Sequence, residues 1–150
     1  MARLTVRPVD RADVEAWLRL RIQLWPEGTE LEHREEIARY LAGQASEPMA
    51  VFVAESHGLL VGFAELAIRP FAEGCYTDRV AYLEGWFVAA AERRKGIGRA
   101  LVQAAERWAR QMGCTEFASD TAPTNVESIN AHSAVGFGQV GTVLCFRKKL

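Results

Sequence analysis

The stretch LEGWFVAAAERRKGIGRA, residues 83–100, joins an apolar run to an amphipathic pattern through a turn that contains two glycines. The apolar run before the turn is typical of a buried strand. Apolar residues recur at helical spacing after the turn, at Ile97, Leu101, Ala104, Trp108 and Met112. Gly96 and Gly98 permit a tight turn whose backbone N–H groups face one anion. The stretch therefore predicts a strand, a tight turn and a helix whose N-terminus binds an anion.

Four basic residues surround this turn, at Arg93, Arg94, Lys95 and Arg99. Their charges and the positive end of the helix dipole favour a pyrophosphate. The alternative is a solvent-exposed basic loop that only begins a helix. The turn is not a P-loop, since no G-x-x-x-x-G-K-[ST] is present, and it lacks the third glycine of a dinucleotide fingerprint.

Apolar periodicity and turn residues predict the other elements of the chain. We expect strands over residues 4–6, 49–55, 60–68, 80–88, 115–119 and 140–147, and helices over 10–25, 31–41, 98–112 and 126–135. Ser56, His57 and Gly58 indicate a hairpin between the second and third strands. This order predicts one α+β domain over residues 1–150, with a mixed, mainly antiparallel sheet flanked by about four helices.

Composition excludes several classes of protein. The chain has 150 residues, 18 basic and 19 acidic, so its net charge of −1 provides no global field for nucleic acid or an anionic membrane. Its three cysteines are far apart, with no C-x-x-C and no histidine at metal-ligand spacing, so we expect reduced thiols and no metal. Without a signal peptide or a membrane-spanning apolar run, the expected location is the cytoplasm.

The run Glu84-Gly85-Trp86-Phe87-Val88, followed by Arg93-x-x-Gly96-x-Gly98, resembles the pyrophosphate-binding motif of GNAT acetyltransferases. The order of elements over nearly the whole chain resembles that fold as well. The resemblance implies acetyl-CoA as co-substrate, its pantetheine arm paired with the strand backbone as an added strand. The implied cofactor contacts are Trp86, Phe87, Val88, Arg93, Arg94, Lys95, Gly96, Ile97, Gly98, Arg99 and, at the start of the next helix, Asn125. A helix cap is the alternative role of Asn125.

Four further matches resemble the small dimeric aminoglycoside 6′-N-acetyltransferases. They are Leu24-Trp25-Pro26, Leu83-Glu84-Gly85, Ala118-Ser119-Asp120-Thr121 and Gly136-Phe137. This likeness implies acetylation of the 6′-amine of aminoglycosides, antibiotic resistance, a homodimer, and Trp25 as one wall of the acceptor site. Two residues depart from the pattern: Gly28 replaces a histidine, and Gly141 replaces a glutamate that lines the sugar site.

A cationic amine requires carboxylates at its site, and Glu84 and Asp120 are the candidates. An alkylamine has a pKa near 10, so a base must remove a proton before it attacks a thioester. We assign Asp120 as the base and Glu84 as a substrate anchor or water-mediated alternative, although Asp120 also suits a turn. The N–H of Val88 would meet the developing oxyanion.

His132 occupies the place where many GNAT enzymes carry a tyrosine that protonates the departing thiolate. A packed or hydrogen-bonded histidine is the alternative, so the general acid stays unidentified. Two alternatives for the whole protein remain at this point: an N-acetyltransferase for another cationic amine such as a polyamine, and a non-catalytic module that binds acyl-CoA.

Overall fold

The computed structural model describes residues 3–150, which form one five-stranded sheet in the order β1-β2-β3-β4-β5. Its strands are β1 (Leu4–Pro8), β2 (Ala50–Ser56), β3 (Leu59–Arg69), β4 (Val80–Val88) and β5 (Glu116–Ser119). Neighbours from β1 to β4 pair antiparallel, and β5 pairs parallel with β4. The sheet is therefore mixed and mainly antiparallel, which confirms the predicted fold class.

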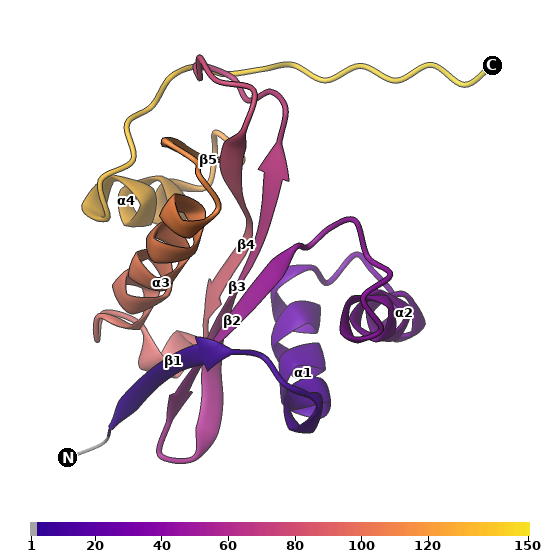
Figure 1. The fold of residues 1–150 in the computed structure, drawn as a ribbon, viewed down its shortest axis with the longest axis vertical. Helices are drawn as coiled ribbons and strands as arrows, with labels where there is room; N and C mark the ends of the chain where they lie inside the picture. The colour runs from indigo at the N-terminus through magenta and orange to yellow at the C-terminus, as the bar shows by residue number, and fades with distance from the viewer. Residues whose placement is uncertain (1–2) are drawn as a thin grey trace.

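Helices cover both faces of this sheet (Figure 1). They are α1 (Val14–Leu24), α2 (Glu30–Leu41), α3 (Ile97–Gln111) and α4 (Val126–Ala134), with short 3-10 turns η1 (Arg11–Asp13) and η2 (Ala90–Glu92). Figure 1 shows α1 and α2 on one side of the sheet and α3 and α4 on the other. Within residues 3–150, no helix is long and apolar enough to span a bilayer.

Local sequence signals explain most of these boundaries. The hairpin between β2 and β3 turns at His57 and Gly58, which both have positive φ, as a tight hairpin of this hand requires. A capping box begins α2, since Thr29 accepts from the N–H of Glu32 and the Glu32 carboxylate accepts from the N–H of Thr29. The predicted elements up to residue 135 are thus confirmed, with ends that differ by at most four residues.

The core has two layers because side chains alternate across the sheet. On one face Phe63 packs with Trp17 of α1 and Ile37 of α2. On the other, Leu66 of β3 packs with Leu101 of α3. The strong amphipathic pattern of residues 97–112 thus buries one stripe of α3 against the sheet, as the sequence predicts.

The prediction of a strand over residues 140–147 is wrong. No helix or strand follows α4 in the described chain, and residues 138–150 are exposed and extend away from the body (Figure 1). Valine, leucine and phenylalanine favour a strand only where another strand edge can pair with them. Here Val140 contacts Gly74, but Leu144 and Phe146 project into solvent.

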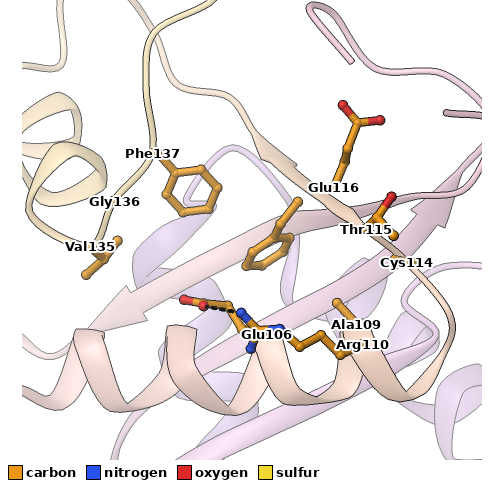
Figure 2. Close-up of a pocket in the computed structure, with 10 residues that line it drawn as sticks. Glu106, Ala109, Arg110, Cys114, Thr115, Glu116, Val135, Gly136 and Phe137 are labelled. Atoms are coloured by element: carbon orange, nitrogen blue, oxygen red, sulfur yellow. Dashed lines mark ion pairs between the residues drawn. The ribbon is translucent and has the colours of Figure 1, made fainter. Parts of the chain in front are cut away.

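A groove of about 370 Å³ lies between α3, β5 and the chain that follows α4 (Figure 2). Phe117 and Phe137 line it, with ring centroids 5.3 Å apart, and the ion pair of Glu106 and Arg110 borders it. The groove lies beside β5, the edge strand of the sheet. It is separate from the carboxylate-lined cavity described below.

One charged network is buried under the sheet. Glu65 on β3 is only 3% exposed, and its carboxylate accepts from the Trp17 indole at 3.1 Å. The Arg21 guanidinium lies 3.2 Å from Glu65 and also pairs with Glu36. Burial raises the pKa of Glu65 to about 7, although the Arg21 charge and the Trp17 hydrogen bond act in the opposite direction.

This pKa predicts how stability depends on pH. A carboxyl group whose pKa is higher in the folded than in the unfolded state stabilises the fold at low pH, and this stabilisation is lost as pH rises through about 7. Between pH 5 and pH 8, the free energy of unfolding of the parent should therefore fall relative to Glu65→Gln, by about 2–3 kcal/mol. Urea denaturation of both proteins at each pH measures this; a pH-independent difference would contradict it.

Candidate active site

The two strands at the centre of the site diverge. β5 pairs with β4 only from Val80 to Leu83, where Leu83 is opposite Ser119. β4 continues to Val88, paired with β3 alone among the described strands. Residues 84–88 therefore present an open backbone edge on the β5 side, and such an edge can pair with an extended ligand.

The turn after β4 leads into α3 through two residues with positive φ, Arg94 (64°) and Gly96 (84°). Gly96 is the N-cap, and within residues 3–150 no side chain caps the helix. Its first turn contains no acidic residue. Because the first N–H groups of an α-helix have no partner inside the helix, they face outward here beside the open edge of β4. This is the geometry of an anion site.

Trp86 joins the open edge to the helix. Its indole N–H donates to the carbonyl of Gly98 at 3.2 Å. A Cβ on Gly98 would lie 3.2 Å from the indole ring, so the glycine lets strand and helix approach closely. The conformation of the turn is thus coupled to that of β4.

Most of the basic side chains at the turn are bound within the protein. Arg93 donates to the carbonyl of Val88 at 2.9 Å and pairs with Glu127 at 3.1 Å. Lys95 pairs with Glu92, and Arg99 donates to the carbonyl of Ala134. Of the four basic residues, only Arg94 makes no ion pair or side-chain hydrogen bond with the described part of the chain.

A cavity of about 290 Å³ opens on the other face of the sheet and brings Trp25 and Glu84 together. The Trp25 indole lies directly over β4, where a Cβ on Gly85 would be 2.5 Å from the ring. The remaining lining residues are Arg21, Gly28, His33, Glu36, Glu47, Pro48 and Glu65. Four of the lining side chains are glutamates and one is an arginine, so the cavity favours a cation.

Polar contacts fix the Trp25 wall. The Nε of Arg21 donates to Nδ1 of His33 at 3.3 Å, so the proton of neutral His33 is on Nε2. That Nε2–H donates to the Trp25 carbonyl at 3.1 Å, and the two rings stack. Sequence reasoning missed this network because its members come from α1, α2 and β3.

Glu84 is held by an ion pair that the sequence did not indicate. Arg69, the last residue of β3, donates to both of its oxygens at 2.7 and 2.8 Å. The register between β3 and β4 shifts beside Glu84, which therefore has no partner residue on β3. A bidentate pair of this kind fixes the position of the carboxylate at the edge of the cavity.

Asp120 follows the last residue of β5 and is exposed. One of its oxygens accepts a hydrogen bond of 2.5 Å from the Tyr82 hydroxyl. Tyr82 was not predicted as a site residue, although it precedes Glu84 by two positions, a spacing that places strand side chains on one face.

His132 and Asn125 make the contacts of their alternative roles, which are a hydrogen-bonded, packed histidine and a helix cap. Nδ1 of His132 donates to the carbonyl of Ser128 at 2.7 Å, and its Nε2 lies 2.8 Å from the Ser119 hydroxyl. The His132 ring packs edge-on against Trp86. The Asn125 side chain accepts from the N–H of Ser128 and caps α4.

Comparison with known proteins agrees with this geometry. Residues 14–137 match the model of the family described as "Acetyltransferase (GNAT) family". The chain belongs to this family. The divergent strands and uncapped α3 are therefore the centre of a GNAT fold.

Several proteins similar to this chain are named as one class of acetyltransferase, the aminoglycoside N(6′)-acetyltransferases. The chain is 56% identical to an aminoglycoside N(6′)-acetyltransferase type 1 of Klebsiella aerogenes, over 97% of the chain and 96% of that relative. Among solved structures, AAC(6′)-Iy in complex with CoA has a TM-score of 0.93 at 35% identity, over 100% of this chain and 97% of that one. AAC(6′)-Iy with a bisubstrate analogue, CoA-S-monomethyl-acetylneamine, has a TM-score of 0.91 at 36% identity, over 99% of each chain.

The contact of Trp25 with Gly85 gives a prediction. In Gly85→Ala the added Cβ would lie 2.5 Å from the indole, so the ring must move away from β4. We expect the free energy of unfolding to fall by about 1–3 kcal/mol. The matched control is Gly138→Ala, where a Cβ meets nothing within 4 Å and we expect less than about 0.5 kcal/mol. Denaturant titration of both variants checks this, and equal stability would show that the wall is loosely packed.

Proposed function

We propose that the protein transfers the acetyl group of acetyl-CoA to the 6′-amine of aminoglycosides. The observation that carries this proposal is the position of an anion-binding helix start and an open strand edge beside a glutamate-lined cavity. The relatives named as aminoglycoside N(6′)-acetyltransferases support the choice of acceptor.

The residues at the open edge fit acetyl-CoA. The first N–H groups of α3 and the unpaired Arg94 suit a pyrophosphate, and residues 86–88 of β4 offer backbone groups to an extended pantetheine arm. The co-substrate supplies the activated acetyl group as a thioester. Lys95, Arg93 and Arg99 hold the turn to neighbouring segments, which keeps the site formed before the ligand arrives.

The cavity provides the charge that a polyamine-like sugar requires. The carboxylates of Glu36, Glu47 and Glu84 line it above the buried Glu65, and Trp25 forms an apolar wall. Charge-assisted hydrogen bonds to ammonium groups contribute about 1.5–3 kcal/mol each. Gly28 belongs to the same lining, and a Cβ there would lie 3.1 Å from Nε2 of His33.

The reaction removes two protons from the acceptor nitrogen, one before it attacks and one as the amide forms. Asp120 takes a proton from the 6′-ammonium, and the neutral amine then attacks the thioester carbonyl in a ternary complex. A C–N bond forms, and the N–H of Val88 stabilises the oxyanion of the tetrahedral intermediate. As the C–S bond breaks, the second proton of the nitrogen passes to the departing thiolate, and CoA leaves as a free thiol. Glu84, held by Arg69, anchors a second polar group of the acceptor.

Asp120→Asn tests this assignment. An amide cannot accept the proton, so kcat should fall by about 10²–10⁴-fold while acetyl-CoA still binds. Asp10→Asn is the matched control, because Asp10 caps η1 far from the site and asparagine also caps. Thiol release with acetyl-CoA and tobramycin gives kcat, and calorimetry gives CoA affinity. Parent-like turnover by Asp120→Asn would remove Asp120 from the mechanism.

Two other functions remain testable in the same assay. Release of thiol with spermidine, and none with kanamycin or tobramycin, would indicate an acetyltransferase for polyamines. Tight binding of acetyl-CoA without release of thiol for any amine would indicate a binding module. We expect turnover with the aminoglycosides, and a mass increase of one acetyl group.

We infer further that the protein is a homodimer, in which residues 138–150 of each copy pack on the β5 edge of the other. The groove beside β5 has room for apolar side chains, and Leu144 and Phe146 are 79% and 92% exposed. Because β5 is an edge strand, its free backbone groups can pair with an added strand.

Replacing Leu144 and Phe146 together by aspartate tests the dimer. The two charges cannot enter an apolar groove, so light scattering should give a monomer where the parent gives a dimer. The control replaces Lys148 and Lys149 by alanine and should remain dimeric. A monomeric parent, or a dimer that survives both aspartates, would contradict the exchange. Circular dichroism confirms that each variant is folded.

We also infer a cytoplasmic enzyme that confers resistance to aminoglycosides. All three cysteines, Cys75, Cys114 and Cys145, are free thiols, as is usual in a reducing compartment. Expression of the parent should raise the inhibitory concentration of tobramycin for a sensitive bacterium, and expression of Asp120→Asn should not.

A further inference from the structure

Tyr82 lies at the point where β4 and β5 begin to diverge. It pairs with Ala118 of β5 and with Ala67 of β3, and its side chain is only 7% exposed. Only its hydroxyl reaches the edge of the site, where it donates to Oδ2 of Asp120 at 2.5 Å. The residue is therefore anchored in the sheet at one end and bound to Asp120 at the other.

Arg69 is in contact with the same tyrosine. Its guanidinium lies 3.6 Å from the centroid of the Tyr82 ring and makes the bidentate pair with Glu84. A chain of contacts thus runs from Asp120 after β5, through Tyr82 on β4 and Arg69 on β3, back to Glu84 on β4. Both carboxylates that the sequence singles out are fixed by this chain.

Asp120 depends on such a contact for its position. It is exposed and follows the last residue of β5, so burial does not fix its side chain. The Tyr82 hydroxyl binds Oδ2. Oδ1 makes no hydrogen bond within residues 3–150 and is left for an incoming amine.

The hydroxyl remains a donor over the working pH range. Burial raises the pKa of Tyr82, and so does the hydrogen bond to Asp120, although the Arg69 charge acts in the opposite direction. The charged groups that act on the Tyr82 hydroxyl are Asp120, Glu84 from β4 and Arg69 from β3. His132 from α4 contacts the hydroxyl of Ser119, the residue before Asp120. None of these competes with Tyr82 as a donor to Oδ2.

We propose that Tyr82 is a positioning residue of the reaction, which aims the carboxylate of Asp120 and, through Arg69, ties it to Glu84. This proposal rests on the proposed function, because it requires Asp120 as the base. Tyr82 itself exchanges no proton with the acceptor. It holds one oxygen of the base so that the other faces the amine.

Tyr82→Phe tests the proposal because it keeps the ring under Arg69 and removes only the hydroxyl. Without the hydroxyl, the carboxylate of Asp120 can turn away from the amine, so the loss should appear in turnover and not in the binding of acetyl-CoA. We expect kcat to fall about 10-fold with an unchanged KM for acetyl-CoA.

Tyr40→Phe is the matched control. Tyr40 packs edge-on against Trp17 in the cluster that joins α1 and α2 to the sheet, a cluster that does not include Asp120. Tyr40→Phe removes the same atom from a tyrosine of that cluster but should leave kcat unchanged. A kcat that falls equally in both variants would identify a general effect of destabilisation and overturn the positioning role.

Combining Tyr82→Phe with Asp120→Asn separates the inference from the proposed function. If Tyr82 acts through Asp120, the double variant should be no slower than Asp120→Asn alone. An inactive Asp120→Asn together with a parent-like kcat for Tyr82→Phe would leave the base assignment intact and sink the positioning role. An active Asp120→Asn would overturn the base assignment itself, and the positioning role with it.

Discussion

The structure depends on the unequal pairing of one strand. β3 supports β4 along its whole length, whereas β5 accompanies it only as far as Leu83. The separation leaves the backbone of residues 84–88 open and places Asp120 at the end of β5 on the opposite side of the gap. Trp86 fixes the far end of the open strand against the start of α3. The sheet thus brings the open edge for the co-substrate and the carboxylate of Asp120 together where β4 and β5 separate.

Charge is distributed around this gap in two ways. At the start of α3 the backbone supplies positive partial charges, and most arginine and lysine side chains brace the turn rather than face solvent alone. In the cavity beyond Trp25, glutamates outnumber the single buried Arg21. An anionic co-substrate and a cationic acceptor are therefore favoured on different faces of the same strand, which keeps them in separate subsites.

The sequence was sufficient for the parts of the molecule that local rules determine. The glycine turn at residues 93–98, the amphipathic stripe of α3 and the hairpin at His57 each follow from short-range constraints, so their positions were predicted closely. Trp25 was expected at the acceptor site from a family resemblance and Glu84 from the charge of an amine, and both residues line one cavity of the structure. The predicted strand over 140–147 failed because strand formation needs a partner edge that one copy of the chain does not provide.

Arg69, Tyr82 and the buried Arg21–Glu65 pair could not be predicted from sequence patterns. Each owes its role to a neighbour far away in the chain, and a lone arginine or tyrosine in a strand carries no signal of that neighbour. The bulge beside Glu84 has the same origin, since it depends on the register with β3.

The central claim is transfer to one particular amine, and a matched pair of acceptors tests it most directly. Kanamycin B and kanamycin C differ only in carrying a 6′-amine or a 6′-hydroxyl. With acetyl-CoA and the purified protein, kanamycin B should release thiol and gain one acetyl group at N6′ by mass spectrometry, while kanamycin C should do neither. Acetylation of kanamycin C at a similar rate, or of kanamycin B at another nitrogen, would contradict the account.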